Sequence, residues 1–120
     1  MEFNSNKPIY LQISDSICEK ILSGEYPEEG RILSVRELGA EIGVNPNTIM
    51  RTYEELERKD IIFNKRGIGY FVSEGAVSLV RKALKKDFLE NELPSLFKTM
   101  KLLNVSVEDM TSLYEKYLEG

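Results

Sequence analysis

The sequence has no histidine and no tryptophan, and its 120 residues include one cysteine, Cys18. Histidine is the commonest general base and metal ligand in proteins, so its absence argues against hydrolytic and metal-dependent activities. A single cysteine forms neither a thiolate cluster nor an intrachain disulfide, which fits a reducing compartment. We therefore expect no enzymatic activity, no metal and no cofactor.

Long apolar segments are also lacking. The longest apolar runs are a few residues, whereas a helix that crosses a bilayer needs about 20. The chain does not begin with a charged stretch followed by an apolar one, as a secretory signal does. We expect a soluble, cytoplasmic protein that has no membrane partner.

An excess of positive charge is missing as well. The net charge is −4, and residues 1–75 carry 9 basic against 13 acidic side chains. Proteins that bind nucleic acid usually show a basic footprint. A positive surface on this chain must therefore be local.

The first half of the chain is rich in helix signals. Isoleucine recurs at every fourth position from Ile9 to Ile21, which predicts an amphipathic helix over residues 8–23. Gly24 follows at the place where helices commonly end. The segment 25–33 contains a Tyr-Pro pair and a glycine, and we expect it to form turns.

Two shorter helices follow in close succession. Ser34 and Glu37 have the spacing of a capping box, which predicts a helix that ends at Gly43. Asn45 and Pro46 then supply a capping side chain and a proline for the first helical position. A third helix therefore opens only two residues later, and the two helices must cross steeply.

A hairpin completes this pattern. Residues 61–63 and 70–72 are apolar runs of β-prone residues, and the basic segment 64–69 between them contains two glycines. The order helix, helix, turn, helix, hairpin is that of a winged helix-turn-helix. We expect a mostly α protein with a small β-hairpin, in which residues 1–75 form this domain.

Residues 76–120 return to a helical pattern. Pro94 interrupts it, and the pattern alone allows either a kink in one long helix or the start of a second. Ser106 and Asp109 predict the cap of a last helix. The segment has more apolar residues than it can bury on itself, and we expect a two-fold dimer formed by Leu89, Leu93, Leu96, Phe97, Met100, Leu103, Tyr114 and Tyr117. The alternative is that this stripe packs only on its own amino-terminal domain.

The start of the third predicted helix suits the major groove of DNA. Asn45, Asn47 and Thr48 are short polar side chains that can approach base edges, and Arg51 lies one turn further along. The simpler interpretation of Asn45 is a helix cap. We expect Asn45, Asn47 and Thr48 to form the DNA-reading edge, and Arg51 to reach either a base or the sugar-phosphate backbone.

Positive charge flanks this helix in the sequence. Arg36 lies in the first turn of the second predicted helix, which in a helix-turn-helix lies against the sugar-phosphate backbone. Lys65 and Arg66 stand at the hairpin tip, where Gly67 permits a sharp turn beside a phosphate or the minor groove. The alternative is that such residues are ordinary surface charges, with Arg36 and Arg51 paired to Glu37 or Glu55.

Five segments together resemble GntR-type bacterial repressors, with the same order and spacing. They are Pro8-Ile9-Tyr10-Leu11-Gln12-Ile13 followed by Gly30, Ser34-Val35-Arg36-Glu37-Leu38, Gly43-Val44-Asn45-Pro46-Asn47-Thr48, Tyr53-Glu54-Glu55-Leu56-Glu57, and Arg66-Gly67-Ile68-Gly69-Tyr70-Phe71-Val72. The resemblance covers roughly residues 7–72. It implies DNA contacts at Arg36, Asn47, Thr48, Arg51 and residues 65–67.

The resemblance extends to the organisation of the chain. The short helical tail is similar to the YtrA-type branch, whose carboxy-terminal helices serve dimerisation in place of a large effector domain. One departure is Leu33, where the family usually has a proline before the serine of the second helix. We expect a homodimeric repressor that binds a palindromic operator in double-stranded DNA.

Two rival functions remain open at this level. One is a winged-helix module that binds proteins and not DNA, which the acidic charge balance suits. The other is a ligand-binding or catalytic helical protein, against which the missing histidine counts. A 45-residue tail has little room for the ~300 Å³ cavity of a small-molecule site, so any effector, whose identity is unknown, is expected between domains or at a dimer interface.

Overall fold

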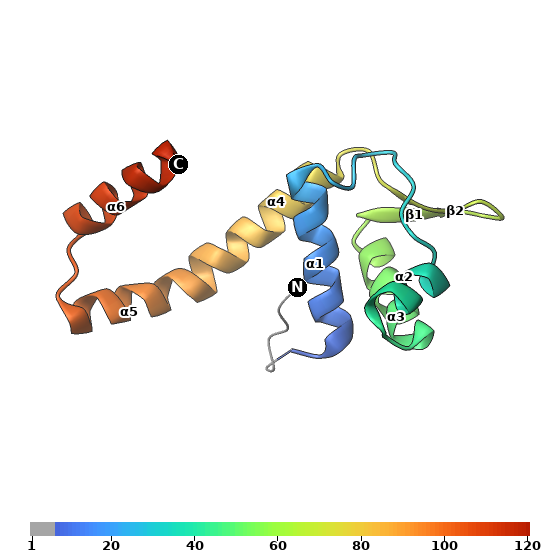
Figure 1. Cartoon of the computed structure of the whole chain (residues 1–120), viewed down its shortest axis with the longest axis horizontal. Coiled ribbons are helices and arrows are strands. Elements are labelled where there is room, and N and C mark those ends of the chain that lie inside the picture. Colours follow the sequence, from blue (N-terminus) through green and yellow to red (C-terminus); the bar gives the residue numbers. More distant parts are fainter. Residues whose placement is uncertain (1–6) are drawn as a thin grey trace. The chain divides into compact units, whose positions relative to one another are not determined.

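The computed structural model describes residues 7–120. The chain divides into two compact units, of which the first ends at Lys82 and the second is Ala83–Gly120. Figure 1 shows the order of the helices and strands along the chain. Residues 7–82 of the first unit form three helices, a hairpin and the beginning of a fourth helix.

Three helices form the body of the first unit. They are α1 (Ile9–Ser23), α2 (Val35–Ile42) and α3 (Pro46–Arg58). Both α1 and α2 pack against α3, and Figure 1 shows α2 and α3 side by side. All three were predicted from the apolar spacing and the capping residues, and all three predictions are confirmed.

The predicted capping box of α2 is present. The Glu37 N–H donates to the Ser34 hydroxyl at 3.1 Å, and the Glu37 carboxylate accepts from the Ser34 N–H at 2.9 Å. The bond from the Ser34 N–H lowers the pKa of the Glu37 carboxyl below its ordinary value, because it favours the charged form. Gly43 ends the helix with a φ of 70°, a left-handed conformation that favours glycine.

The hairpin consists of β1 (Ile62–Lys65) and β2 (Gly69–Val72). The strands are antiparallel, and Phe63 lies opposite Phe71. In Figure 1 the hairpin extends away from α2 and α3. The winged helix-turn-helix predicted from the sequence is therefore confirmed as the fold of this unit.

The segment before α2 is more than a turn. Arg31 forms a β-bridge with Phe71 on the outer side of β2. The Ile32 N–H donates to the Tyr70 carbonyl at 3.0 Å, and the Val72 N–H donates to the Gly30 carbonyl at 2.9 Å. The sequence predicted only turns here, because this pairing depends on residues about 40 positions away.

The core of the first unit is almost entirely aliphatic. Both α1 and α2 pack on α3, and α3 also contacts β1 of the hairpin. The buried apolar residues are Ile13, Ile17, Cys18, Ile21, Ile32, Leu38, Ile49, Tyr53, Leu56, Ile61, Ile62, Val72, Ala76 and Val80. Burial of this apolar surface is the main favourable contribution to folding.

A distant carboxylate fixes the start of α4 (Ala76–Asp87). The Gly75 N–H donates to the Glu28 carboxylate at 2.8 Å, and the Val77 N–H donates to it at 3.1 Å. Free N–H groups at a helix start favour an anion. These two bonds lower the pKa of the Glu28 carboxyl below its ordinary value.

The second unit contains the end of α4, the π-helical turn η1 (Phe88–Glu92), α5 (Leu93–Leu103) and α6 (Val107–Glu119). Asp87, Glu92 and Leu93 all keep right-handed helical dihedral angles. Proline has no N–H to donate to the preceding turn, and Pro94 is the second residue after the π-helical turn. The sequence left open whether Pro94 kinks one helix or starts a second. In the structure the chain stays helical from α4 to α5 through the π-helical turn that precedes Pro94.

The last helix begins as the sequence predicted. The Asp109 N–H donates to the Ser106 hydroxyl at 3.0 Å, and the Ser106 N–H donates to the Asp109 carboxylate at 3.1 Å. No residue of η1, α5 or α6 is buried. Among residues 7–120, no helix is both long enough and apolar enough to span a membrane.

Candidate nucleic-acid interface

Four of the predicted DNA-binding residues lie at the amino-terminal half of α3. Asn45 is the N-cap, and its side-chain oxygen accepts from the Asn47 N–H at 2.8 Å. Asn47 and Arg51 are exposed, and Thr48 is half-buried. The side-chain oxygen of Asn45 is therefore used as a helix cap, as the simpler interpretation held. The Asn47 and Thr48 side chains form no hydrogen bond with any residue that the structure describes.

Two buried side chains hold α3 in position. The Thr52 hydroxyl donates to the Tyr10 carbonyl of α1 at 2.7 Å, and the Tyr53 hydroxyl donates to the Leu33 carbonyl at 2.6 Å. The Tyr53 ring also contacts Tyr70 edge-on, with 4.8 Å between ring centroids. Burial raises the pKa of the Tyr53 hydroxyl, so it stays a donor at physiological pH.

The Tyr53 bond also bears on the one departure from the family pattern. Leu33 stands where a proline would stiffen the chain before Ser34. Here the Leu33 carbonyl is held by Tyr53 instead. The start of α2 is thus tied directly to α3.

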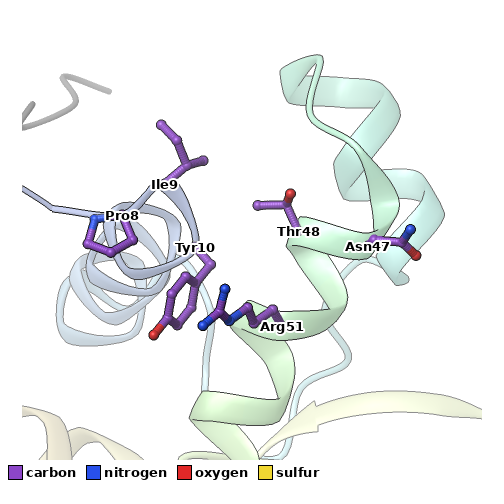
Figure 2. Close-up of a pocket in the computed structure, with 6 residues that line it drawn as sticks. All are labelled: Pro8, Ile9, Tyr10, Asn47, Thr48 and Arg51. Carbon is purple, nitrogen blue, oxygen red and sulfur yellow. The ribbon is translucent and has the colours of Figure 1, made fainter.

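Arg51 lies against α1. Its guanidinium carbon is 4.1 Å from the centroid of the Tyr10 ring. Figure 2 shows Thr48 and Arg51 projecting from α3 toward α1, whereas Asn47 points the other way. An open cleft of about 420 Å³ lies where the start of α1 meets α3 and is lined by Pro8, Ile9, Tyr10, Asn47, Thr48 and Arg51.

The acidic neighbours of the predicted contact residues are engaged elsewhere. Glu55 lies 2.6 Å from Arg58 and 3.3 Å from Lys59, and the hydrogen bond from Arg58 lowers its pKa. Glu37 is held in the capping box. Within residues 7–120, Arg36 forms no ion pair with either of them, and neither does Arg51. The alternative in which surface pairs neutralise these arginines is not what the structure contains.

The hairpin tip carries the remaining predicted residues. Lys65 lies over the Phe71 ring, 4.5 Å from its centroid, and Phe71 stacks on Phe63. Arg66 is exposed and has no partner among the described residues. Gly67 has a φ of 80°, which favours glycine at the tip.

Two residues that contribute to this surface were not predicted from the sequence. Tyr10 follows Ile9 and stands one position off the isoleucine stripe, which is the one signal that it faces a different neighbour from the core. Arg31 lies over the backbone of Gly69, where a β-carbon would come within 3.0 Å of its Nε. Both belong to contacts between distant segments, which local patterns do not reveal.

The described part of the chain offers little for catalysis. It contains no group of three or more acidic or thiol side chains that could hold a metal ion. Cys18 is buried in the core, and this burial raises the pKa of its thiol to about 11. The thiol is therefore protonated and unreactive at neutral pH.

The predicted dimerisation residues lie on the helices of the second unit. Leu93 and Met100 are half-buried, and the others are exposed. Further apolar residues of the same helices are exposed as well, among them Leu102, Val107, Leu113 and Leu118. The exposed fraction reaches 78% for Tyr117 and 68% for Leu103.

Comparison with known proteins connects this geometry to a family. The family profile described as bacterial regulatory proteins, gntR family, matches residues 9–72. The HTH-type transcriptional regulator YhcF of Bacillus subtilis is 39% identical over 119 residues, which cover 99% of this chain and 97% of that protein. The HTH-type transcriptional repressor YtrA of the same organism is 33% identical, covering 87% of this chain and 90% of that protein.

Solved structures agree with these sequence relationships. A putative GntR-family transcriptional regulator from Bacteroides thetaiotaomicron superimposes with a TM-score of 0.74 at 45% identity. The match covers 93% of this chain and 97% of that one. The similarity therefore includes the helices after the hairpin as well as the winged domain.

Proposed function

This chain belongs to the GntR family of bacterial regulatory proteins, and on that premise we propose that it is a homodimeric repressor of transcription that binds a palindromic operator. The winged domain of residues 1–75 contacts the duplex. Residues 76–120 form the dimer. The sequence-reading element is α3, which enters the major groove with Asn47 and Thr48 at its leading edge.

The observation that carries this proposal is that the polar leading edge of α3 is exposed and is not used for hydrogen bonding within the described residues. The Asn47 side chain is exposed and forms no hydrogen bond within the described residues, while the buried side chains of Thr52 and Tyr53 anchor the helix. A rigid helix with a free amide at its leading edge suits hydrogen bonding to an adenine edge. The polar surface is presented to a partner rather than used for folding.

Positive charge on both sides supports the same orientation. Arg36 and Arg66 come from α2 and the hairpin, and each is exposed without an acidic partner in residues 7–120. Contacts of arginine with phosphates position a protein on the duplex but do not read its sequence. Their role is therefore affinity, whereas Asn47 supplies specificity.

The dimer is supported by the exposed apolar surface of the second unit. Most of the large apolar side chains of α5 and α6 are exposed in the single chain, and the exceptions, Leu93, Met100 and Met110, are half-buried. Soluble monomers rarely expose contiguous apolar surface on this scale, and two-fold dimers are the commonest assembly. Repression is supported by the 33% identical relative that is named a repressor, and it follows from occupancy of the operator.

Two measurements test the proposal. Titration of fluorescently labelled genomic fragments should show saturable binding that weakens steeply as salt increases, because phosphate contacts release counterions. Sedimentation at micromolar concentration should give a dimer. A monomer would rule out the dimer, and the absence of duplex binding would instead favour a winged-helix module that binds proteins.

A further inference from the structure

We propose that the cleft between α1 and α3 is a binding site for one backbone phosphate of the DNA, and that Tyr10 positions Arg51 to hold it. This inference rests on the proposed function and deepens it. The family comparison assigns no role to Tyr10 or to this cleft. The contact between Tyr10 and Arg51 is what separates a phosphate-binding role for Arg51 from a base-reading one.

The position of Arg51 favours a phosphate. The Arg51 side chain extends from α3 toward α1. Its guanidinium carbon lies over the Tyr10 ring, 4.1 Å from the ring centroid. In a helix-turn-helix only the recognition helix enters the groove, while neighbouring helices lie against the sugar-phosphate backbone. A guanidinium held beside α1 therefore lies at the rim of the groove, where the phosphates are.

The chemistry of the cleft also favours an anion. Its lining residues include one cation and no carboxylate. Arg51 forms no hydrogen bond or ion pair with a residue in the described range, so its five N–H donors stay available. Contact with an aromatic ring consumes none of these donors. The planar guanidinium group suits a phosphate, because two of its parallel N–H groups can bind two phosphate oxygens.

Tyr10 is a positioning residue in this arrangement. The hydrogen bond from Thr52 to the Tyr10 carbonyl fixes the backbone of Tyr10 against α3 at 2.7 Å. The ring then offers a flat face that limits where the guanidinium can lie. Because the geometry is set before DNA arrives, less side-chain freedom is lost on binding.

The test compares Tyr10→Leu with Tyr10→Phe as a matched control, since phenylalanine keeps the ring and loses only the hydroxyl. Tyr10→Leu and Arg51→Ala should each weaken binding to selected and random duplexes alike. The expected loss for Arg51→Ala is roughly fivefold at 0.15 M salt, which corresponds to one counterion, with a salt slope smaller by about one. Tyr10→Leu should add nothing further in the Arg51→Ala background, and Tyr10→Phe should bind as the wild type.

A second measurement identifies the phosphate directly. A neutral methylphosphonate linkage is placed at successive positions of a selected half-site. One position should weaken the wild type but not Arg51→Ala, and thermal unfolding should confirm that each variant is folded. Wild-type affinity for Tyr10→Leu, or an Arg51→Ala variant that loses discrimination at one base pair with an unchanged salt slope, would overturn the inference. Those results leave operator binding intact, whereas a wild-type protein without duplex binding would overturn the proposed function itself.

Discussion

The hydroxyl of Tyr53, on the buried face of α3, donates a hydrogen bond of 2.6 Å to the main-chain carbonyl of Leu33. Leu33 directly precedes the N-cap of α2, so this bond joins the two helices of the helix-turn-helix across 20 residues of sequence. Buried carbonyls are rarely left without a donor. The bond therefore contributes both to the stability of the first unit and to the orientation of its proposed DNA-reading edge.

Tyr53→Phe tests this contribution. The substitution keeps the ring in the core but leaves the Leu33 carbonyl without its donor. We expect the free energy of unfolding to fall by about 1–3 kcal/mol, measured by urea denaturation. Tyr26→Phe is the matched control, because Tyr26 is half-buried in the same unit and its hydroxyl forms no hydrogen bond within residues 7–120, and it should change stability by less than about 0.5 kcal/mol.

Glu28 makes the stability depend on pH. The pKa of the Glu28 carboxyl in the folded state is lower than its ordinary value of 4.5. The two bonds that the carboxylate accepts at the start of α4 therefore stabilise the fold fully at pH values above 4.5. This stabilisation disappears as the pH falls through the folded-state pKa. Wild type should exceed Glu28→Gln in stability at pH 7, and the difference should shrink below pH 4.5. Chemical denaturation across this range measures it, with the exposed Glu41→Gln as control; a difference independent of pH would contradict the assignment.

These contacts also mark the limit of what the sequence predicts. Capping boxes, the isoleucine stripe and the Asn45-Pro46 start are local signals, and each predicted its helix correctly. The cap that Glu28 provides lies 47 residues from Gly75, and Arg31 pairs with Phe71 across a similar separation. No local pattern carries that information, because tertiary folding alone brings those segments together.

The proposed interface shows the same division. Its polar residues could be named from the sequence, because they follow the start of a predicted helix and the tip of a predicted hairpin. The direction of Arg51 could not, because it depends on Tyr10 of α1. The π-helical turn before Pro94 could not be predicted either, since a proline in a helical pattern is compatible with several local geometries.

If the exposed apolar side chains of the second unit form the dimer, one charge added among them should disrupt it. Leu103→Glu places a carboxylate on a side chain that is 68% exposed in the single chain and that the proposed dimer would bury. We expect this variant to sediment as a monomer at concentrations where the wild type is a dimer, because burying an unpaired charge is costly. Its helix content should be unchanged.

The control for this prediction lies on the same helix. Ser95→Glu adds the same charge at an exposed polar position of α5 and should leave the dimer intact. If both variants are dimeric, the dimer surface lies elsewhere. If both are monomeric, the effect is one of net charge.

The hairpin tip predicts a change in affinity that does not depend on sequence. Arg66→Ala removes an exposed charge without an acidic partner in residues 7–120. We expect weaker binding to selected and random duplexes in equal proportion, with a salt slope lower by about one. Lys20→Ala removes a charge at the far end of α1 and should leave the slope unchanged. A loss confined to the selected site would assign Arg66 a base contact instead.

The role of α3 is tested by selection of bound duplexes from a random-sequence pool, once with the wild type and once with Asn47→Ala. We expect the wild type to enrich an inverted repeat whose half-sites are about one helical turn apart. We expect Asn47→Ala to lose about 1–3 kcal/mol at that site while its salt-dependent binding to random duplex persists. Enrichment of the same repeat to the same degree by Asn47→Ala, or of no repeat by the wild type, would contradict the claim that α3 reads the operator.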